Sequence, residues 1–190
     1  MMTFLRQFIR HPIKTGAISG ASLEVANLIA RQETLARAKN VVELGSGTGR
    51  LTEKILENIS TDTDFFAVEI NPHFVKVTKK RCPDAIVYND SAINMKKYLL
   101  RHGTDGCDCI ISGLPWAWMD VNAQEELLDT IVDALNPGGQ FIASAYMPGA
   151  FFTTPGRRFR KMLNGRFRTV KRSKILWNNF PPYIAYFCEK

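Results

Sequence analysis

The stretch Val41-Val42-Glu43-Leu44-Gly45-Ser46-Gly47-Thr48-Gly49 decides the fold of this 190-residue chain. It begins with a short apolar run, continues with a turn that has glycine at every second position, and leads into residues 50–59, which show helical periodicity. Glycine lets the backbone turn sharply, and it lets a ligand come close to the peptide N–H groups. The stretch therefore predicts a buried strand, a ligand-binding turn and a helix, in that order.

An acidic residue closes the next strand. The run from Phe65 to Val68 is apolar, and Glu69 follows it, twenty residues after Gly49. A carboxylate at this place in an α/β fold can accept hydrogen bonds from both hydroxyls of a ribose. A dinucleotide site would need the spacing GxGxxG, but Arg50 occupies the third glycine position here. The turn and the acid together indicate a nucleotide-like ligand far more strongly than either does alone.

Strand-like and helical patterns alternate after residue 40, which is typical of βαβ units with right-handed crossovers and a largely parallel sheet. The predicted strands are 41–44, 65–68, 86–88, 107–112 and 140–146, and the predicted helices are 50–59, 72–81, 91–101 and 122–135. Asp120 is the expected N-cap of the last helix. A helix near 156–163 then precedes strand-like runs at 166–177 and 183–188. No crossover helix fits between these runs, so they should form a C-terminal antiparallel hairpin.

Length and composition fit one domain over residues 1–190. With 45% hydrophobic residues, a chain of this size can bury one sizeable core. The four cysteines do not form the framework of a small secreted protein and no signal peptide precedes them, so we expect a cytoplasmic protein. Cys107 and Cys109 have no second ligand pair beside them, and we expect no metal site.

The positive charge of the chain is concentrated in one segment. The net charge is +7, yet residues 151–175 hold nine Lys or Arg and no acidic residue, which leaves the remainder with 16 basic against 18 acidic residues. Such a patch attracts polyanions, either nucleic acid or anionic lipid, unless it is only a solvated face.

Residues 1–20 form a second candidate for membrane contact. An amphipathic basic helix is predicted there, closed by Pro12, with its apolar face formed by Phe4, Leu5, Phe8 and Ile9. It either caps the core or lies in a membrane interface. No apolar run approaches the length of a membrane span, so we expect any contact with a membrane to be peripheral.

The run from Glu43 to Gly49 resembles motif I of the class I S-adenosylmethionine-dependent methyltransferases, which have a Rossmann-like, seven-stranded, mostly parallel sheet. The resemblance covers residues 40–190. It implies S-adenosylmethionine as the cofactor, with Glu69 on the ribose and the segment after the third strand on the adenine. The cofactor-binding residues implied in this way are Glu43, Gly45, Ser46, Gly47, Gly49, Glu69, Ile70, Asn89, Asp90, Ser91 and Ser112.

The fourth strand ends in Ser112-Gly113-Leu114-Pro115-Trp116-Ala117-Trp118, where methyltransferases hold the acceptor. In those that act on adenine, an Asn or Asp at this strand end accepts a hydrogen bond from the base amine, and an aromatic ring stacks on the flipped base. This chain keeps the proline and the aromatic ring, but Gly113 offers only backbone, and Ser112 offers a short hydroxyl one place earlier. The substitution weakens the case for adenine without excluding it.

A second resemblance spans nearly the whole chain. Ser112-Gly113-Leu114-Pro115 is similar to a motif of bacterial phospholipid N-methyltransferases, which convert phosphatidylethanolamine to phosphatidylcholine. Further stretches match that family in order, namely Gly16-Ala17-Ile18, Tyr146-Met147-Pro148 and Trp177-Asn178-Asn179-Phe180-Pro181-Pro182. The resemblance implies an aminophospholipid substrate and an anionic membrane surface as partners. Trp116-Ala117-Trp118 departs from the more aliphatic family pattern and leaves the head group open.

The predicted acceptor site is apolar and aromatic. Such a site disfavours the ammonium form of a primary amine, aromatic faces suit methylated cations, and one hydroxyl or backbone carbonyl can align the amine lone pair. The expected catalytic residues are Tyr146, Ser112 and Gly113, with Asp120 as an alternative base. The expected substrate-binding residues are Leu114, Pro115, Trp116, Trp118, Tyr146, Arg157 and Arg158. The two tryptophans would wall the pocket, unless they are core or surface anchors, and the arginines would bind lipid phosphate.

Three classes of function stay open at this point. The leading one is a peripheral-membrane N-methyltransferase that acts on an aminophospholipid. The second is an RNA adenine N6-methyltransferase, for which nucleic acid would be the partner of the basic segment, although Gly113 and the lack of an extra helical domain weaken it. The third is a binding protein that keeps the cofactor pocket without catalysis.

Overall fold

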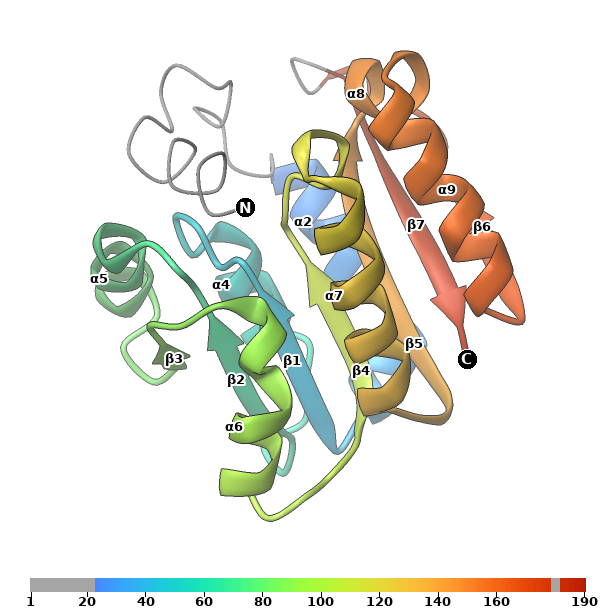
Figure 1. Cartoon of the computed structure of the whole chain (residues 1–190). Helices are drawn as coiled ribbons and strands as arrows, with labels where there is room; N and C mark the ends of the chain where they lie inside the picture. Colours follow the sequence, from blue (N-terminus) through green and yellow to red (C-terminus); the bar gives the residue numbers. More distant parts are fainter. Residues whose placement is uncertain (1–22, 179–181) are drawn as a thin grey trace.

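The computed structural model of the chain describes residues 23–178 and 182–190. The amphipathic segment predicted within residues 1–20, with Gly16-Ala17-Ile18, lies outside the described residues, as do residues 179–181. Within the described ranges, one seven-stranded sheet carries helices on both faces (Figure 1). The predicted α/β fold class is confirmed.

The sheet is mostly parallel and ends in the predicted antiparallel strands. Its strands are β1 (Asn40–Leu44), β2 (Asp64–Val68), β3 (Ile86–Tyr88), β4 (Cys107–Ser112), β5 (Leu135–Tyr146), β6 (Thr169–Arg172) and β7 (Tyr183–Glu189). They lie side by side in the order β3-β2-β1-β4-β5-β7-β6. The strands β1 to β5 pair in parallel, whereas β7 is antiparallel to both β5 and β6. The last strand of the hairpin therefore inserts between β5 and β6.

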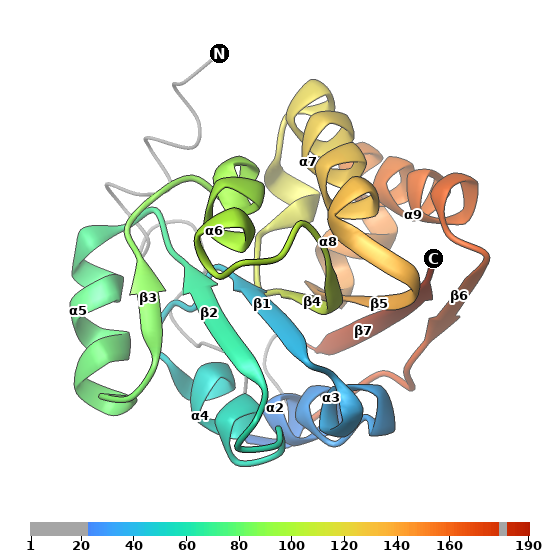
Figure 2. The same ribbon diagram turned by 90° about the horizontal axis from the view of Figure 1, so that it is seen from below.

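Helices cover the two faces in separate groups (Figure 2). One face carries α6 (Met95–Arg101), α7 (Val121–Ala134), α8 (Met147–Phe152) and α9 (Thr154–Arg166), together with the 3-10 turns η1 (Ala92–Asn94) and η2 (Trp116–Trp118). The other face carries α2 (Leu23–Ala30), α3 (Glu33–Arg37), α4 (Arg50–Leu56) and α5 (Pro72–Arg81). No helix in the described part of the chain is long and apolar enough to cross a membrane.

The central strands are apolar on both sides because both faces of a parallel sheet are covered. In β1, Val42 and Leu44 join the core beneath α6 to α9, and Val41 joins the core on the opposite face. Asp120 is the N-cap of α7, as predicted, since its carboxylate accepts the N–H groups of Asn122 and Ala123 at 3.0 and 3.4 Å.

The C-terminal part departs from the sequence prediction in two places. The predicted strand 166–177 is wrong at both ends, since β6 covers only Thr169–Arg172. Arg166 closes α9 and forms an ion pair with Asp129 of α7 at 2.7 Å, and beyond Arg172 an isolated bridge at Leu176 follows. Helix α8 was not predicted, since proline and glycine within it are poor helix formers. It forms because it packs closely on α9, where Gly156 leaves space for the carbonyl of Gly149.

An irregularity in β4 separates two of the cysteines. The register of β4 against β5 shifts between Cys107 and Cys109, so these residues join opposite cores, whereas simple alternation would place them on one face. All four cysteines are buried and free. Among the described residues, no group of three His, Cys, Asp or Glu is arranged to hold a metal ion.

Candidate active site

The turn after β1 has the left-handed backbone that its glycines predicted. Gly45, Gly47 and Gly49 have φ values of 81°, 54° and 77°, a region that favours glycine. A Cβ added at Gly47 would meet no atom within 4 Å, whereas at Gly49 it would come within 3.1 Å of Thr78 on α5. The turn therefore has an open side at Gly47 and a packed side at Gly49.

Ser46 belongs to the packed side. Its hydroxyl lies 3.0 Å from the hydroxyl of Thr78, which also donates to the carbonyl of Gly47 at 3.0 Å. The Ser46 side chain is buried against α5. It holds the shape of the turn, and only its backbone is left for the predicted cofactor contact.

Glu69 joins the end of β2 to the glycine turn. One carboxylate oxygen accepts the N–H of Gly47 at 3.0 Å, and the other accepts the N–H of Asn71 at 2.8 Å. Burial raises the pKa of Glu69, and these N–H donors act in the opposite direction. The backbone N–H of Ile70 is a third donor, and because a carboxylate has about four acceptor positions, about one remains for a hydroxyl group. The predicted ribose-binding acid and the glycine turn are thus in direct contact.

Glu43 lies fully buried beneath the turn. The Thr52 hydroxyl of α4 donates to one of its oxygens at 2.6 Å, and the other oxygen has no hydrogen-bond partner in the described part of the chain. Burial, with a smaller contribution from the charge of Glu69, raises the pKa of Glu43 to about 7. A buried acceptor without a partner is costly, so this oxygen would gain from a donor such as an ammonium group.

The segment after β3 braces the end of β2. The side-chain amide of Asn89 donates to the carbonyls of Glu69 and Ile70 at 2.9 and 3.0 Å. Asp90 accepts the Tyr98 hydroxyl at 2.7 Å, and this bond, followed by further donors from the start of α6, lowers the pKa of Asp90 well below its usual range. Ser91 is the N-cap of η1 without a side-chain cap bond. Asn89 and Asp90 therefore position the rim on which we predict the adenine.

Gly113 marks a close contact between the loops after β1 and β4. A Cβ at this position would lie 2.8 Å from the carbonyl oxygen of Gly45. The Gly113 N–H donates to Leu44 at 2.9 Å, and Leu114 packs its side chain against the same glycine turn. The absence of an Asn or Asp side chain at this strand end is therefore a packing requirement of this backbone.

Trp116 is a core anchor, the alternative left open for it, and Ser112 is buried beside it. The Trp116 ring is 1% exposed and stacks on Phe159 of α9, with 4.4 Å between ring centroids. Its indole N–H donates to the Ser112 hydroxyl at 3.0 Å, because a buried tryptophan needs a partner for that group. The Ser112 hydroxyl is fully buried and also accepts the Leu114 N–H at 3.3 Å. Both side chains support the strand end from within the core, so neither faces an acceptor amine.

The remaining predicted acceptor residues lie on β5, η2 and α9 or next to them. Tyr146 is half-buried at the end of β5, with its ring perpendicular to that of Tyr183 at 5.1 Å. Trp118 is 51% exposed, and its indole nitrogen is near Gly149 of α8. Pro115 is half-buried, ahead of η2. Arg157 and Arg158, which were predicted to bind the lipid phosphate, are exposed on α9.

Sequence reasoning missed three side chains that support the site. Thr52 and Thr78 fix Glu43 and the glycine turn, as described above. Gln124 of α7 is fully buried, donates to the carbonyls of Trp116 and Pro155, and leaves its own oxygen without a partner. One sequence signal could have found them. They are polar residues on the inner, otherwise apolar faces of the predicted helices, and a helical-wheel plot shows such positions.

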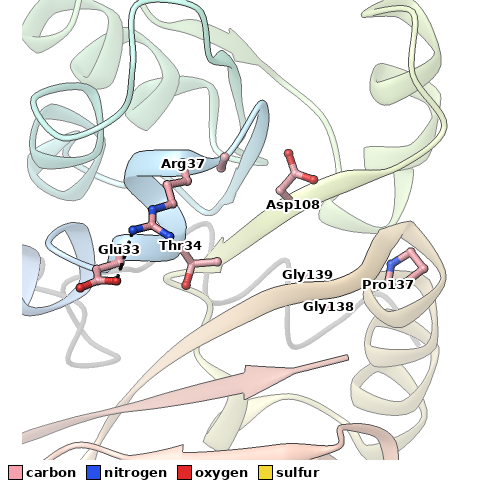
Figure 3. A pocket seen from close by; sticks show the side chains of 8 residues that line it. Glu33, Thr34, Arg37, Asp108, Pro137, Gly138 and Gly139 are labelled. Carbon is pink, nitrogen blue, oxygen red and sulfur yellow. Dashed lines mark ion pairs between the residues drawn. The ribbon is translucent and has the colours of Figure 1, made fainter.

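A separate hollow of about 330 Å³ lies at the other end of the sheet (Figure 3). It is lined by α3 and by the turn at Pro137 to Gly139, with Asp108 at its edge. The Asp108 carboxylate already accepts two N–H groups and the side chain of Asn136. None of the predicted site residues borders this hollow, and we assign it no role.

A seven-stranded sheet of this order, with a glycine turn and two buried acids at the carboxyl ends of its strands, defines a Rossmann-like methyltransferase fold. A model of the methyltransferase domain matches residues 41–139, which is just over half of the chain. The chain therefore belongs to the methyltransferase domain family. It is an S-adenosylmethionine-dependent methyltransferase, and S-adenosylmethionine is its cofactor.

Comparison with individual proteins agrees with this assignment. The chain is 26% identical over 189 residues to an ornithine lipid N-methyltransferase of Singulisphaera acidiphila, covering 98% of this chain and 94% of that protein. Its fold is similar to an O-methyltransferase from Bacillus cereus solved with S-adenosylhomocysteine, at a TM-score of 0.71 and 12% identity over 98% and 90% of the two chains. It is also similar to the O-methyltransferase TomG from Streptomyces achromogenes, at a TM-score of 0.68 and 17% identity over 99% and 90%.

The residues present fit the cofactor. The open side at Gly47 admits a ligand, Glu69 has an acceptor position left for a ribose hydroxyl, and the unpartnered oxygen of Glu43 suits the ammonium group of the methionine part. S-adenosylmethionine supplies an electrophilic methyl group on a sulfonium. The protein must hold that group and bring an acceptor in line with it.

Proposed function

We propose that this protein methylates the primary amine of a membrane aminolipid, converting phosphatidylethanolamine towards phosphatidylcholine. The observation that carries the proposal is the close contact between Gly113 and the carbonyl oxygen of Gly45. This contact leaves no room at position 113 for the Asn or Asp side chain that would bind a nucleobase amine. What remains at the end of β4 is backbone with Leu114 and Pro115 beside it. An acceptor at this place meets an apolar wall and peptide groups.

Such surroundings suit a lipid amine. A primary ammonium with an ordinary pKa near ~10.4 requires roughly 4–5 kcal/mol to be presented as the free amine at neutral pH. An apolar pocket disfavours the charged form and so supplies part of that free energy. The Gly113 carbonyl can accept a hydrogen bond from an N–H of the free lipid amine and so aim the nitrogen lone pair at the methyl group. The Tyr146 ring can contact the amine or its methylated products.

Membrane contact would involve the end of the molecule at which β4 ends and the acceptor would bind. Three aromatic side chains are strongly exposed there, with exposed fractions of 51% for Trp118, 74% for Phe152 and 66% for Trp177. Leu176 bridges to Tyr183, which pairs with Tyr146 at the end of β5, so Trp177 belongs to this end as well. Aromatic rings enter a membrane interface readily, and each nearby Lys or Arg adds about 1 kcal/mol on an anionic surface.

A second acceptor is favoured by one specific observation. The ornithine lipid N-methyltransferase of Singulisphaera acidiphila matches 98% of this chain, and ornithine lipid also offers a primary amine on a lipid anchor. We therefore hold ornithine lipid as the alternative substrate within the same proposal.

The test offers labelled S-adenosylmethionine with phosphatidylethanolamine vesicles, ornithine lipid vesicles and structured RNA in parallel, and counts the organic and aqueous phases. We expect label in the organic phase with phosphatidylethanolamine. Label with ornithine lipid alone would select the second acceptor, and label confined to RNA would overturn both. Cofactor binding without transfer in any arm would instead identify a binding protein.

A further inference from the structure

The outer edge of the sheet places a buried tyrosine beside an arginine. Arg172, the last residue of β6, is paired with Tyr186 of β7. Side chains of directly opposed residues in an antiparallel pair project from the same face of the sheet, with Cβ atoms roughly 5 Å apart. This is the face beneath α9, because the Phe159 ring lies edge-on to the Tyr186 ring at 6.2 Å. Arg172 therefore projects towards α9.

A second arginine converges on the same place. The guanidinium of Arg160, on α9, lies 5.8 Å from the centre of the Phe151 ring of α8, and that of Arg172 lies 5.1 Å from it. Both distances are in the range of cation–π contacts. Segments from α8, α9 and β6 thus bring two positive charges onto one aromatic ring.

No acid in the described part of the chain neutralises this pair. Arg166 and Arg168 nearby do have partners, since they form ion pairs with Asp129 and Glu189. Arg160 and Arg172 form none, and residues 151–175 contain no acidic side chain. Two like charges held at one ring without a counter-charge repel each other, and an anion between them would remove that repulsion.

The Tyr186 hydroxyl provides an independent sign of a missing ligand. The residue is 2% exposed, and its hydroxyl has no hydrogen-bond partner among residues 23–178 and 182–190. Burial raises the pKa of Tyr186, while the charges of Arg160 and Arg172 act in the opposite direction. Arg172 lies directly opposite Tyr186 in the strand pair, and Arg160 follows Phe159, whose ring contacts the Tyr186 ring. Because a buried hydroxyl without a partner is costly, a donor group here needs an acceptor.

We propose that Arg160, Arg172 and Tyr186 bind the oxyanion of a phosphate group. Guanidinium groups donate in a planar fork that matches phosphate oxygens, and a phosphate has enough acceptor positions for two arginines and a hydroxyl. In the sheet order, β4, β5 and β7 lie between β6 and the strand that carries the glycine turn. The site is therefore separate from the cofactor site and does not depend on the proposed acceptor. A lipid head group and free phosphate are both sources of this chemistry.

Calorimetric titration with inorganic phosphate tests the site directly. We expect Arg160→Gln and Arg172→Gln each to weaken phosphate binding about tenfold or more, and Tyr186→Phe to weaken it by about three- to tenfold. The matched controls are Lys161→Gln, the next residue on α9, and Lys171→Gln, which faces the other side of β6 opposite Phe187. They remove the same charge and should change the affinity less than about twofold.

Three other outcomes would contradict the proposed phosphate site. Equal losses in the arginine and lysine variants would mean diffuse charge attraction, and acetate binding as tight as phosphate binding would overturn the assignment to phosphate. Wild-type protein that binds no phosphate at millimolar concentration would also overturn it. Melting curves of every variant identify any that is unfolded, and Tyr186→Phe keeps the buried ring, so at least this variant should fold.

Vesicles separate the two sources of phosphate. If Arg160→Gln releases the protein from phosphatidylglycerol vesicles and Lys161→Gln does not, the ligand is a lipid head group. If the arginine variants lose affinity for inorganic phosphate while their vesicle binding is unchanged, the ligand is a free phosphate compound. Both results support the site, whereas vesicle binding and phosphate binding that are both insensitive to Arg160 and Arg172 would contradict it.

Discussion

At the scale of single residues, the protonation of Glu43 makes stability depend on pH. The folded-state pKa of about 7 is above the ordinary value of 4.5, so the folded protein holds this proton more firmly than the unfolded chain does. The stabilising contribution is complete below the unfolded pKa and is lost as the pH rises through about 7. Between pH 5 and 8 this loss approaches about 3 kcal/mol.

Replacing Glu43 by Gln should remove that dependence. We expect the free energy of unfolding of the wild type, measured with urea without cofactor, to fall relative to Glu43→Gln as the pH is raised from 5 to 8. Glu57→Gln is the control, because Glu57 is exposed and pairs with Lys54 on the surface. Parallel pH profiles for the wild type and Glu43→Gln would contradict the proposed protonation.

A second residue-scale prediction concerns Glu69. Hydrogen bonds to a charged acceptor are each worth about 1.5–3 kcal/mol, so Glu69→Gln should weaken binding of S-adenosylhomocysteine by about 10- to 100-fold. Titration calorimetry measures this, with Glu57→Gln again as the control. An unchanged affinity in Glu69→Gln would remove the ribose-binding role from this residue.

The sequence located these two acids at the carboxyl ends of adjacent strands, because periodicity locates strand ends, and the structure places both beside the glycine turn. Their roles toward the cofactor stay predictions. For Ser112 and Trp116 the neighbouring residues suggested an apolar, aromatic acceptor site, whereas the structure buries both side chains in the core. Their burial depends on Phe159, more than forty residues away, which stacks on the Trp116 ring. No local pattern contains that contact.

At the scale of elements, two glycines of α9 should respond in opposite directions to the same change. Gly156 faces the backbone of α8, where a Cβ would meet Gly149 and Ala150, whereas a Cβ at Gly165 would meet nothing within 4 Å. Gly165→Ala should stabilise the protein by about 0.5–1 kcal/mol, because alanine suits a helix better. Gly156→Ala should destabilise it by about 1–3 kcal/mol through overpacking. Urea unfolding of both variants checks this, and equal effects would show that α8 does not restrict α9.

The observed bounds of the elements also show which helix and strand ends the sequence pattern could predict and which it could not. The helix predicted at 72–81 is observed with the same bounds, because Asn71 caps it and Pro72 begins it. The predicted strand at 140–146 begins earlier, at Leu135, because that residue pairs with Cys107 across the irregularity in β4. Local capping signals are encoded in neighbouring residues, whereas strand ends depend on a partner strand.

At the scale of the whole molecule, the concentration of charge predicts salt-sensitive adsorption. The protein should pellet with anionic vesicles at low ionic strength and be released as salt is added, since charges at a surface are screened beyond about 10 Å at 0.1 M salt. Equal recovery in the supernatant with anionic and neutral vesicles would exclude this mode of binding.

The exposed aromatic residues should contribute a part that salt does not remove. Trp118→Ala and Phe152→Ala should lower vesicle binding at every salt concentration, because they remove apolar area from the interface. Leu100→Ala is the matched control: Leu100 is 66% exposed, but it lies in the last turn of α6, which leads to the opposite end of β4. A loss in Leu100→Ala as large as in Trp118→Ala would mean that the orientation on the membrane is not the one proposed.

The insertion of β7 between β5 and β6 has a consequence for the order of assembly. Although β6 comes first along the chain, β7 is its one partner among the strands that the structure describes. It therefore joins the sheet either after β7 or together with it, and it cannot precede it. Arg172 and Tyr186 sit on these two strands, so the proposed phosphate site exists only once assembly is complete. Phosphate binding at that site would therefore require the completely folded protein, and a partly folded chain would lack the site.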